Sequence, residues 1–169
     1  MGIAWHYMQM INSKFRNSNH LEFIISLTSL LLLTSLGSSF LLSLIESKNI
    51  IWFEPPSPKN HNIVLLIIEG VFIAPIIETF VFQTLPYYYL NKVNFLKTKG
   101  YLILIISALF FGVQHCYDLF YIIYGFMMGL VFMYGYMVRI KTDKYTFYLI
   151  AVSHGLFNLG VSISQYYQG

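Results

Sequence analysis

Long apolar runs dominate this sequence of 169 residues, and they constrain its fold more than any other feature. A helix needs about 20 consecutive, mostly apolar residues to cross the hydrocarbon core of a bilayer. Only 10% of the residues are charged, whereas a soluble globular domain carries about 25%. We therefore predict an all-α, polytopic membrane protein with about five transmembrane helices, drawn at residues 22–45, 62–90, 101–116, 120–138 and 145–166.

The chain has room for one domain. A short arm at residues 1–20 precedes a single transmembrane helical domain at residues 21–169. Apolar residues recur at helical spacing in the arm, so residues 4–15 could form a helix on the membrane surface, with a frayed arm as the alternative. The single cysteine, Cys116, cannot form an internal disulfide.

The lysines and arginines indicate the orientation of the chain. With five crossings, the arm and the loops at residues 91–100 and 139–144 share one side of the membrane, which then holds eight of the ten basic residues. Cytoplasmic segments carry an excess of Lys and Arg. We therefore expect a multi-pass protein of the cell membrane with a cytoplasmic N-terminus. The basic residues form no stripe interleaved with aromatic side chains, which argues against binding of nucleic acid.

Four polar residues lie inside the predicted spans, where ionisable groups are costly and indicate a functional site. They come from three spans and are Glu78, His115, His154 and Asn158. Counted from the cytoplasmic end at about 1.5 Å per residue, all four lie at a depth of roughly 14–21 Å. Each alone could form an interhelical hydrogen bond, but their common depth favours a shared site. Glu69 is out of phase with Glu78, so we expect it to line a crevice or to form a structural pair.

These residue types suit the hydrolysis of an amide bond. Glu78 and His115 could together remove a proton from water and produce a nucleophile. His154 and Asn158, which share a helix face, could donate hydrogen bonds to the oxyanion of the tetrahedral intermediate. Alternatively, Glu78, His115 and His154 could bind zinc, because two histidines and a glutamate are a common catalytic zinc shell. The sequence contains no His-Glu-x-x-His motif, so we favour a metal-free mechanism without a cofactor.

Three segments that contain these residues, 74–83, 111–115 and 154–158, resemble the motifs of one family. This is the CPBP family of CAAX proteases and bacteriocin-processing enzymes, also called the Abi family. Its motifs read Glu-Glu-x-x-x-Arg, Phe-x-x-x-His and His-x-x-x-Asn. The resemblance covers residues 61–163 and implies an intramembrane protease. It implies further that Glu78 is the catalytic glutamate, that His115 helps to activate water, and that His154 and Asn158 stabilise the oxyanion.

The first motif departs from the family's pattern. Thr79 stands in place of the second glutamate, and Gln83 stands in place of the arginine. Because both members of a charged pair are replaced, no buried charge is left without a partner. We expect Thr79, Gln83 and Phe111 of the second motif to position the substrate or to support the catalytic residues.

Two functions remain open. The first is an intramembrane endopeptidase of a bacterial cytoplasmic membrane that cleaves a peptide or protein substrate near the cytoplasmic half of the bilayer. The second is a non-proteolytic bacteriocin-immunity or scaffold protein of the same family. A proton-coupled transporter is disfavoured, because the chain lacks the internal repeat of many secondary transporters. The expected partners are membrane lipid and the substrate, and the sequence does not indicate an oligomeric state.

Overall fold

The described part of the chain is helical and contains no strand. The computed structural model describes residues 13–46 and 63–168. Most of the predicted surface helix at residues 4–15 lies outside these ranges, as do Lys48 and Lys59. The separate long helices are α2 (His20–Glu46), α7 (Gly100–Gln114), α8 (Leu119–Arg139) and α9 (Thr146–Gln168).

One further long helical run, residues 63–90, is here called the Glu78 helix. It alternates between α-helical and π-helical turns. A short helix, α6 (Asn94–Lys97), follows it. The parts of the Glu78 helix are α3 (Ile63–Ile67), η1 (Ile68–Ile73), α4 (Ala74–Thr79), η2 (Phe80–Thr84) and α5 (Leu85–Leu90).

Four of the described helices are long and apolar enough to cross a membrane, namely His20–Leu44, Ile68–Leu90, Leu119–Arg139 and Thr146–Ser164. The prediction of an all-α, polytopic membrane protein is therefore confirmed. The remaining predicted span, residues 101–116, corresponds to α7, which has only 15 residues. A helix of that length extends about 22 Å, which is less than the hydrocarbon core of about 30 Å.

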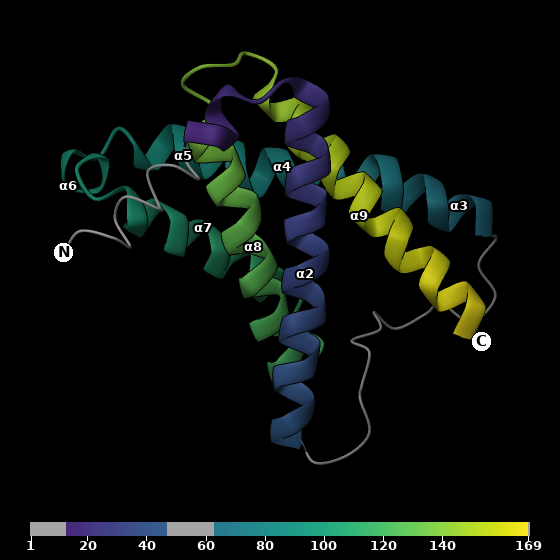
Figure 1. Ribbon diagram of the computed structural model, residues 1–169. Coiled ribbons are helices and arrows are strands. Elements are labelled where there is room, and N and C mark those ends of the chain that lie inside the picture. The colour runs from purple at the N-terminus through teal and green to yellow at the C-terminus, as the bar shows by residue number, and fades with distance from the viewer. Residues whose placement is uncertain (1–12, 47–62, 169) are drawn as a thin grey trace.

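The long helices are not all parallel. Figure 1 shows α2 and α8 side by side, α9 leaning away from them, and the Glu78 helix crossing behind. α2 contacts both α8 and α9, while α9 also contacts η1 and α4. α9 therefore packs against α2 on one side and against the Glu78 helix on another.

Glycines allow α7 and α8 to approach each other closely. A Cβ at Gly112 would lie 2.7 Å from the Ile122 carbonyl oxygen, and a Cβ at Gly129 would lie 2.9 Å from the Ala108 Cα. Since real Cβ atoms do not come so close to backbone, larger residues would push the two helices apart. Gly125 and Gly129 are four residues apart and form the small-residue face that such close packing needs.

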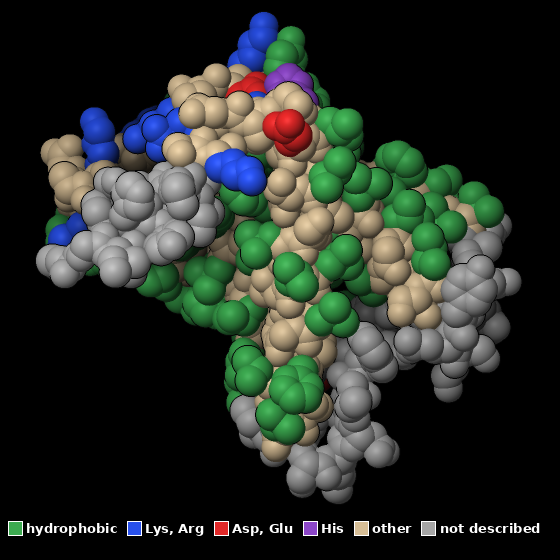
Figure 2. Space-filling model, in the orientation of Figure 1, with side chains coloured by type: hydrophobic (Ala, Val, Ile, Leu, Met, Phe, Trp, Pro, Cys, Tyr) green, Lys and Arg blue, Asp and Glu red, His purple; other side chains and the backbone are tan. Residues whose placement is uncertain are grey.

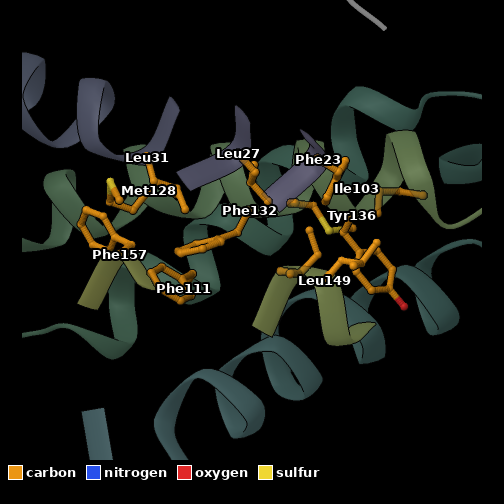
Figure 3. Close-up of a cluster of buried hydrophobic side chains, with 12 residues drawn as sticks. Phe23, Leu27, Leu31, Ile103, Phe111, Met128, Phe132, Tyr136, Leu149 and Phe157 are labelled. Carbon is orange, nitrogen blue, oxygen red and sulfur yellow. The ribbon is translucent and has the colours of Figure 1, made fainter. Parts of the chain in front are cut away.

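The core consists of large apolar side chains from α2, α7, α8 and α9. Figure 3 shows them interleaved, and the labelled residues are Phe23, Leu27, Leu31, Ile103, Phe111, Met128, Phe132, Tyr136, Leu149 and Phe157. The outer surface is also apolar (Figure 2), and Leu33 of α2 and Phe72 of η1 are 67% and 60% exposed. Exposure of so extensive an apolar surface is unfavourable in water but favourable in contact with lipid. The chain is a membrane protein.

A buried arginine ties the N-terminal segment to the loop between α8 and α9. Nη1 of Arg139 donates to the carbonyls of Phe15, Arg16 and Ser18 at 3.2, 2.9 and 2.7 Å. Its Nε and Nη2 donate to Oδ2 of Asp143 at 3.0 and 2.8 Å. Residues 13–18 therefore lie on the same side of the protein as this loop, as the predicted topology requires.

Asp143 is the acceptor at the centre of this contact. Burial alone raises the pKa of its carboxyl, but hydrogen bonds from the Tyr145 N–H, Arg139 and His20 outweigh burial and hold the pKa below its usual range. A carboxyl whose pKa falls on folding stabilises the folded state fully above its unfolded pKa of about 4. That stabilisation is lost as the pH falls through the lower, folded pKa.

We therefore expect the stability of the protein to depend on Asp143 in a pH-dependent way. In neutral detergent at pH 7, Asp143→Asn should lower the melting temperature by several degrees, because Arg139 loses its charged acceptor. The difference in melting temperature between the wild type and the variant should decrease as the pH falls below about 4. Equal melting temperatures at pH 7 would contradict the proposed contribution of this contact.

Candidate active site

Two prolines interrupt the Glu78 helix, and a π-helical turn precedes each of them. η1 precedes Pro75, and η2 precedes Pro86. Proline has no N–H and clashes with the carbonyl four residues earlier, so each proline removes helical hydrogen bonding. In a bilayer no water is present to replace such a bond, so other groups of the protein must supply it.

Side chains from α9 and α7 supply these bonds. Nδ2 of Asn158 donates to the Gly70 carbonyl, five residues before Pro75, at 2.7 Å. The hydroxyl of Ser107 donates to the Phe82 carbonyl, four residues before Pro86. The two helices that carry the predicted histidines are thus joined to the Glu78 helix through its own interrupted backbone.

Gly155 allows α9 to lie against η1. A Cβ at this position would collide with the carbonyl oxygen of Val71 in η1. Gly155 lies directly after His154 in α9, and Asn158 follows one turn later. The contacts at Gly155 and Asn158 therefore set the position of His154 relative to the Glu78 helix.

The structure brings Glu78 and His154 together. Oε2 of Glu78 lies 3.7 Å from Nε2 of His154, and the side chains are 18% and 6% exposed, respectively. This separation exceeds a direct hydrogen bond, which spans about 2.7–3.2 Å. It does suit a water molecule that hydrogen-bonds to both groups. The pair is thus placed to hold a water molecule that hydrogen-bonds to both side chains.

His115 directly follows α7, and its ring folds back onto the last turn of that helix. Nδ1 lies 2.8 Å from the Phe111 carbonyl oxygen. A carbonyl only accepts hydrogen bonds, so Nδ1 carries the proton, and in the neutral ring Nε2 keeps its lone pair. A Cβ at Gly125 would come within 3.3 Å of Nδ1, so a glycine in α8 makes room for this ring. His115 is therefore held in the tautomer that can accept a proton at Nε2.

Aromatic rings fix both imidazoles. The Phe111 ring centroid lies 4.9 Å from that of His115 and 6.1 Å from that of His154. Phe132 of α8 lies against the other imidazole, at 4.3 Å from the ring centroid of His154. Phe111, which we predicted as a supporting residue, thus contacts both histidines of the site.

The remaining predicted residues have other surroundings than Glu78 and the two histidines. Asn158 uses one amide hydrogen for the Gly70 carbonyl. Thr79 and Gln83 are 0% and 1% exposed, so their burial favours support of the helix over contact with a substrate. Glu69 is exposed, and no ion pair of its side chain is found within the described residues. The structure therefore shows no structural ion pair of Glu69 with the described residues.

The predicted alternative of a zinc site does not fit this geometry. Within the described residues, no three His, Cys, Asp or Glu side chains are grouped so that they could hold a metal ion. Glu78, His115 and His154 therefore do not form the zinc shell that their residue types allow.

Sequence reasoning missed one side chain, that of Gln114. It lies beside the Glu78 carboxylate, at the last residue of α7 and directly before His115. Gln114 lies inside the second motif, directly before His115, and this position was the sequence signal that could have identified it. The amide can orient the carboxylate by donating a hydrogen bond, and it does so without adding a charge.

Comparison with known protein families identifies the family of this chain. The sequence model of the family described as "Type II CAAX prenyl endopeptidase Rce1-like" matches residues 60–160, which is more than half of the chain. The chain belongs to this Rce1-like family. No curated protein and no solved structure matches it. The Rce1-like region contains the whole of the site just described, whereas α2 lies outside it and contributes to the core.

Gly155, which lies between His154 and Asn158 in α9, provides a test of how this helix docks. We expect Gly155→Ala to lower the melting temperature, with a cost of about 1–3 kcal/mol, because the added methyl group collides with the Val71 carbonyl. Gly160→Ala in the same helix is the matched control, since a Cβ there meets only Leu32 Cδ2 at 3.9 Å. Melting temperatures that fall equally in both variants would indicate a general effect on α9 and contradict the specific contact.

Proposed function

We propose that this Rce1-like protein is an intramembrane endopeptidase, in which Glu78 and His115 activate a water molecule that attacks a peptide bond. The observation that carries the proposal is the 3.7 Å approach of the Glu78 carboxylate to Nε2 of His154. It is supported by the tautomer of His115, whose Nε2 is available as an acceptor. Membership of a family of endopeptidases supports the same class of reaction.

The proposed reaction follows the usual course of amide hydrolysis. Glu78 removes a proton from the water molecule, which also hydrogen-bonds to Nε2 of His115. The water oxygen forms a bond to the carbonyl carbon, and the electron pair of the C=O double bond moves onto the carbonyl oxygen. His154, with a proton on Nε2, donates a hydrogen bond to that oxyanion. The C–N bond then breaks, and the proton held by Glu78 passes to the leaving amine.

Asn158 serves two purposes in this proposal. Its amide nitrogen carries two hydrogens, and the bond to the Gly70 carbonyl uses one of them. The second hydrogen is available to the oxyanion beside His154, which is one helical turn away on the same face of α9. Asn158 would thereby hold the Glu78 helix in place while it contributes to the oxyanion site.

The proposed substrate is a peptide or protein that enters the site from the bilayer. The excess of Lys and Arg in the segments on one side favours a cytoplasmic N-terminus and cleavage in the cytoplasmic half of a cell membrane. Because the family is named for prenyl endopeptidases, paired peptides with and without a prenyl group would show whether this chain requires the lipid.

A non-proteolytic scaffold or immunity protein is the second candidate. It is favoured by the neutral, fully buried Thr79 and Gln83, which stand where the family has a charged pair. The polar atoms Thr79 Oγ1 and Gln83 Nε2 have no hydrogen-bond partner within the described residues. In this candidate, partner binding would continue after the polar groups of the site are removed.

The substitution Glu78→Gln separates the two candidates. In purified protein reconstituted into liposomes, we expect it to decrease peptide cleavage by at least about a hundredfold, because a general base contributes at least that factor. Glu69→Gln is the matched control, since it removes an exposed carboxylate of the same helix. Its cleavage rate should equal that of the wild type.

Undiminished cleavage by the Glu78→Gln variant would overturn the mechanism. Melting temperatures measured on the same samples show whether the variants are folded. An absence of cleavage by the wild type on both prenylated and unprenylated peptides, with partner protection retained in Glu78→Gln, would favour the non-proteolytic candidate.

A further inference from the structure

A cavity lies at the end of the protein that is remote from the candidate active site. It has a volume of about 380 Å³ and lies between the start of α7, the end of α8 and the N-terminal segment. α7 begins at Gly100, which lines this cavity, and ends just before His115 of the active site. The length of α7, about 22 Å, therefore separates the two sites.

Two basic side chains line the cavity. They are Arg16 of the N-terminal segment and Lys141 of the loop after α8, and both residues are exposed. No carboxylate lies within ion-pair distance of either one among the described residues. The nearby Asp143 is already bound by Arg139 and His20. The two positive charges thus lack a counter-charge from the described part of the protein.

The position of Arg16 is fixed by the structure around it. Its carbonyl oxygen accepts a hydrogen bond from Arg139, which also binds the carbonyls of Phe15 and Ser18. Lys141 lies in the loop, two residues after Arg139, which ends α8. The guanidinium of Arg139 therefore joins the N-terminal segment to the side chain of Asp143, in the loop that carries Lys141. Arg16 and Lys141 line the same cavity beside this contact.

The rest of the lining is largely apolar. Leu104 of α7 and Met137 and Val138 of α8 form this part, together with the ring of Tyr101. Tyr101 is 57% exposed and lies near the beginning of α7, at the end of the protein where Lys and Arg gather in Figure 2. The cavity therefore combines positive charge with an apolar wall at the membrane surface.

We propose that this cavity binds one anionic phospholipid of the surrounding leaflet. Arg16 and Lys141 contact the phosphate of the headgroup, and the first part of an acyl chain lies along Leu104 and Met137. Basic pockets between transmembrane helices on the cytoplasmic side recognise anionic headgroups in this way. An acidic peptide would satisfy the two charges but not the apolar wall that is continuous with the lipid-facing surface.

Native mass spectrometry of the full chain in neutral detergent tests the proposal. The probes are phosphatidylglycerol and phosphatidylcholine with identical acyl chains. We expect the wild type to retain one phosphatidylglycerol with at least tenfold higher affinity than phosphatidylcholine. Arg16→Gln combined with Lys141→Gln should abolish this preference. The control combines Lys14→Gln with Lys97→Gln. It removes two positive charges from the same side of the protein, but neither residue lines the cavity. The control variant should therefore keep the preference for phosphatidylglycerol.

Three outcomes would overturn the proposal. The first is an unchanged preference in the Arg16 and Lys141 double variant, and the second is an equal loss in both double variants, which would indicate general attraction by charge. The third is displacement of the lipid by equimolar inorganic phosphate or glycerophosphoglycerol, which would show that the headgroup binds without a contribution from the apolar wall. Melting temperatures of the two double variants should agree, which shows that a loss of binding does not arise from unfolding.

Discussion

The backbone hydrogen bonds that Pro75 and Pro86 remove from the Glu78 helix are the constraint on which the rest of this structure depends. A polar backbone group without a partner is costly in lipid, so the helix is stable only when neighbours provide donors. α9 provides one through Asn158, and α7 provides one through Ser107. The interruptions of one helix thus determine which faces of two other helices dock against it.

The third motif of the family shows how closely architecture and chemistry are joined. His154 reaches the Glu78 carboxylate, Gly155 admits the Val71 carbonyl, and the residue one turn later bonds to Gly70. These three functions occupy five consecutive positions of α9. The docking of the helix and the geometry of the site therefore cannot vary independently.

The sequence was sufficient to predict the helices, because apolar runs of this length have few other stable states. It also predicted that Glu78 and His154, from separate helices, lie close together. It did not predict the bond between Asn158 and Gly70. A π-helical turn shifts the register by one residue, so the carbonyl that needs a partner lies five residues before Pro75 rather than four. Nor could residue types exclude zinc, because convergence of three ligands depends on helix tilt, which packing determines.

The short length of α7 has a consequence for the supply of water. The proposed hydrolysis would consume one water molecule per turnover, and a hydrocarbon layer holds almost none. An apolar helix shorter than the layer is accommodated by local thinning of the bilayer or by polar residues that reach toward the surface. The exposed turn at Cys116, Tyr117 and Asp118 directly follows His115. The end of α7 would therefore be the place where the aqueous phase comes nearest to the reacting groups.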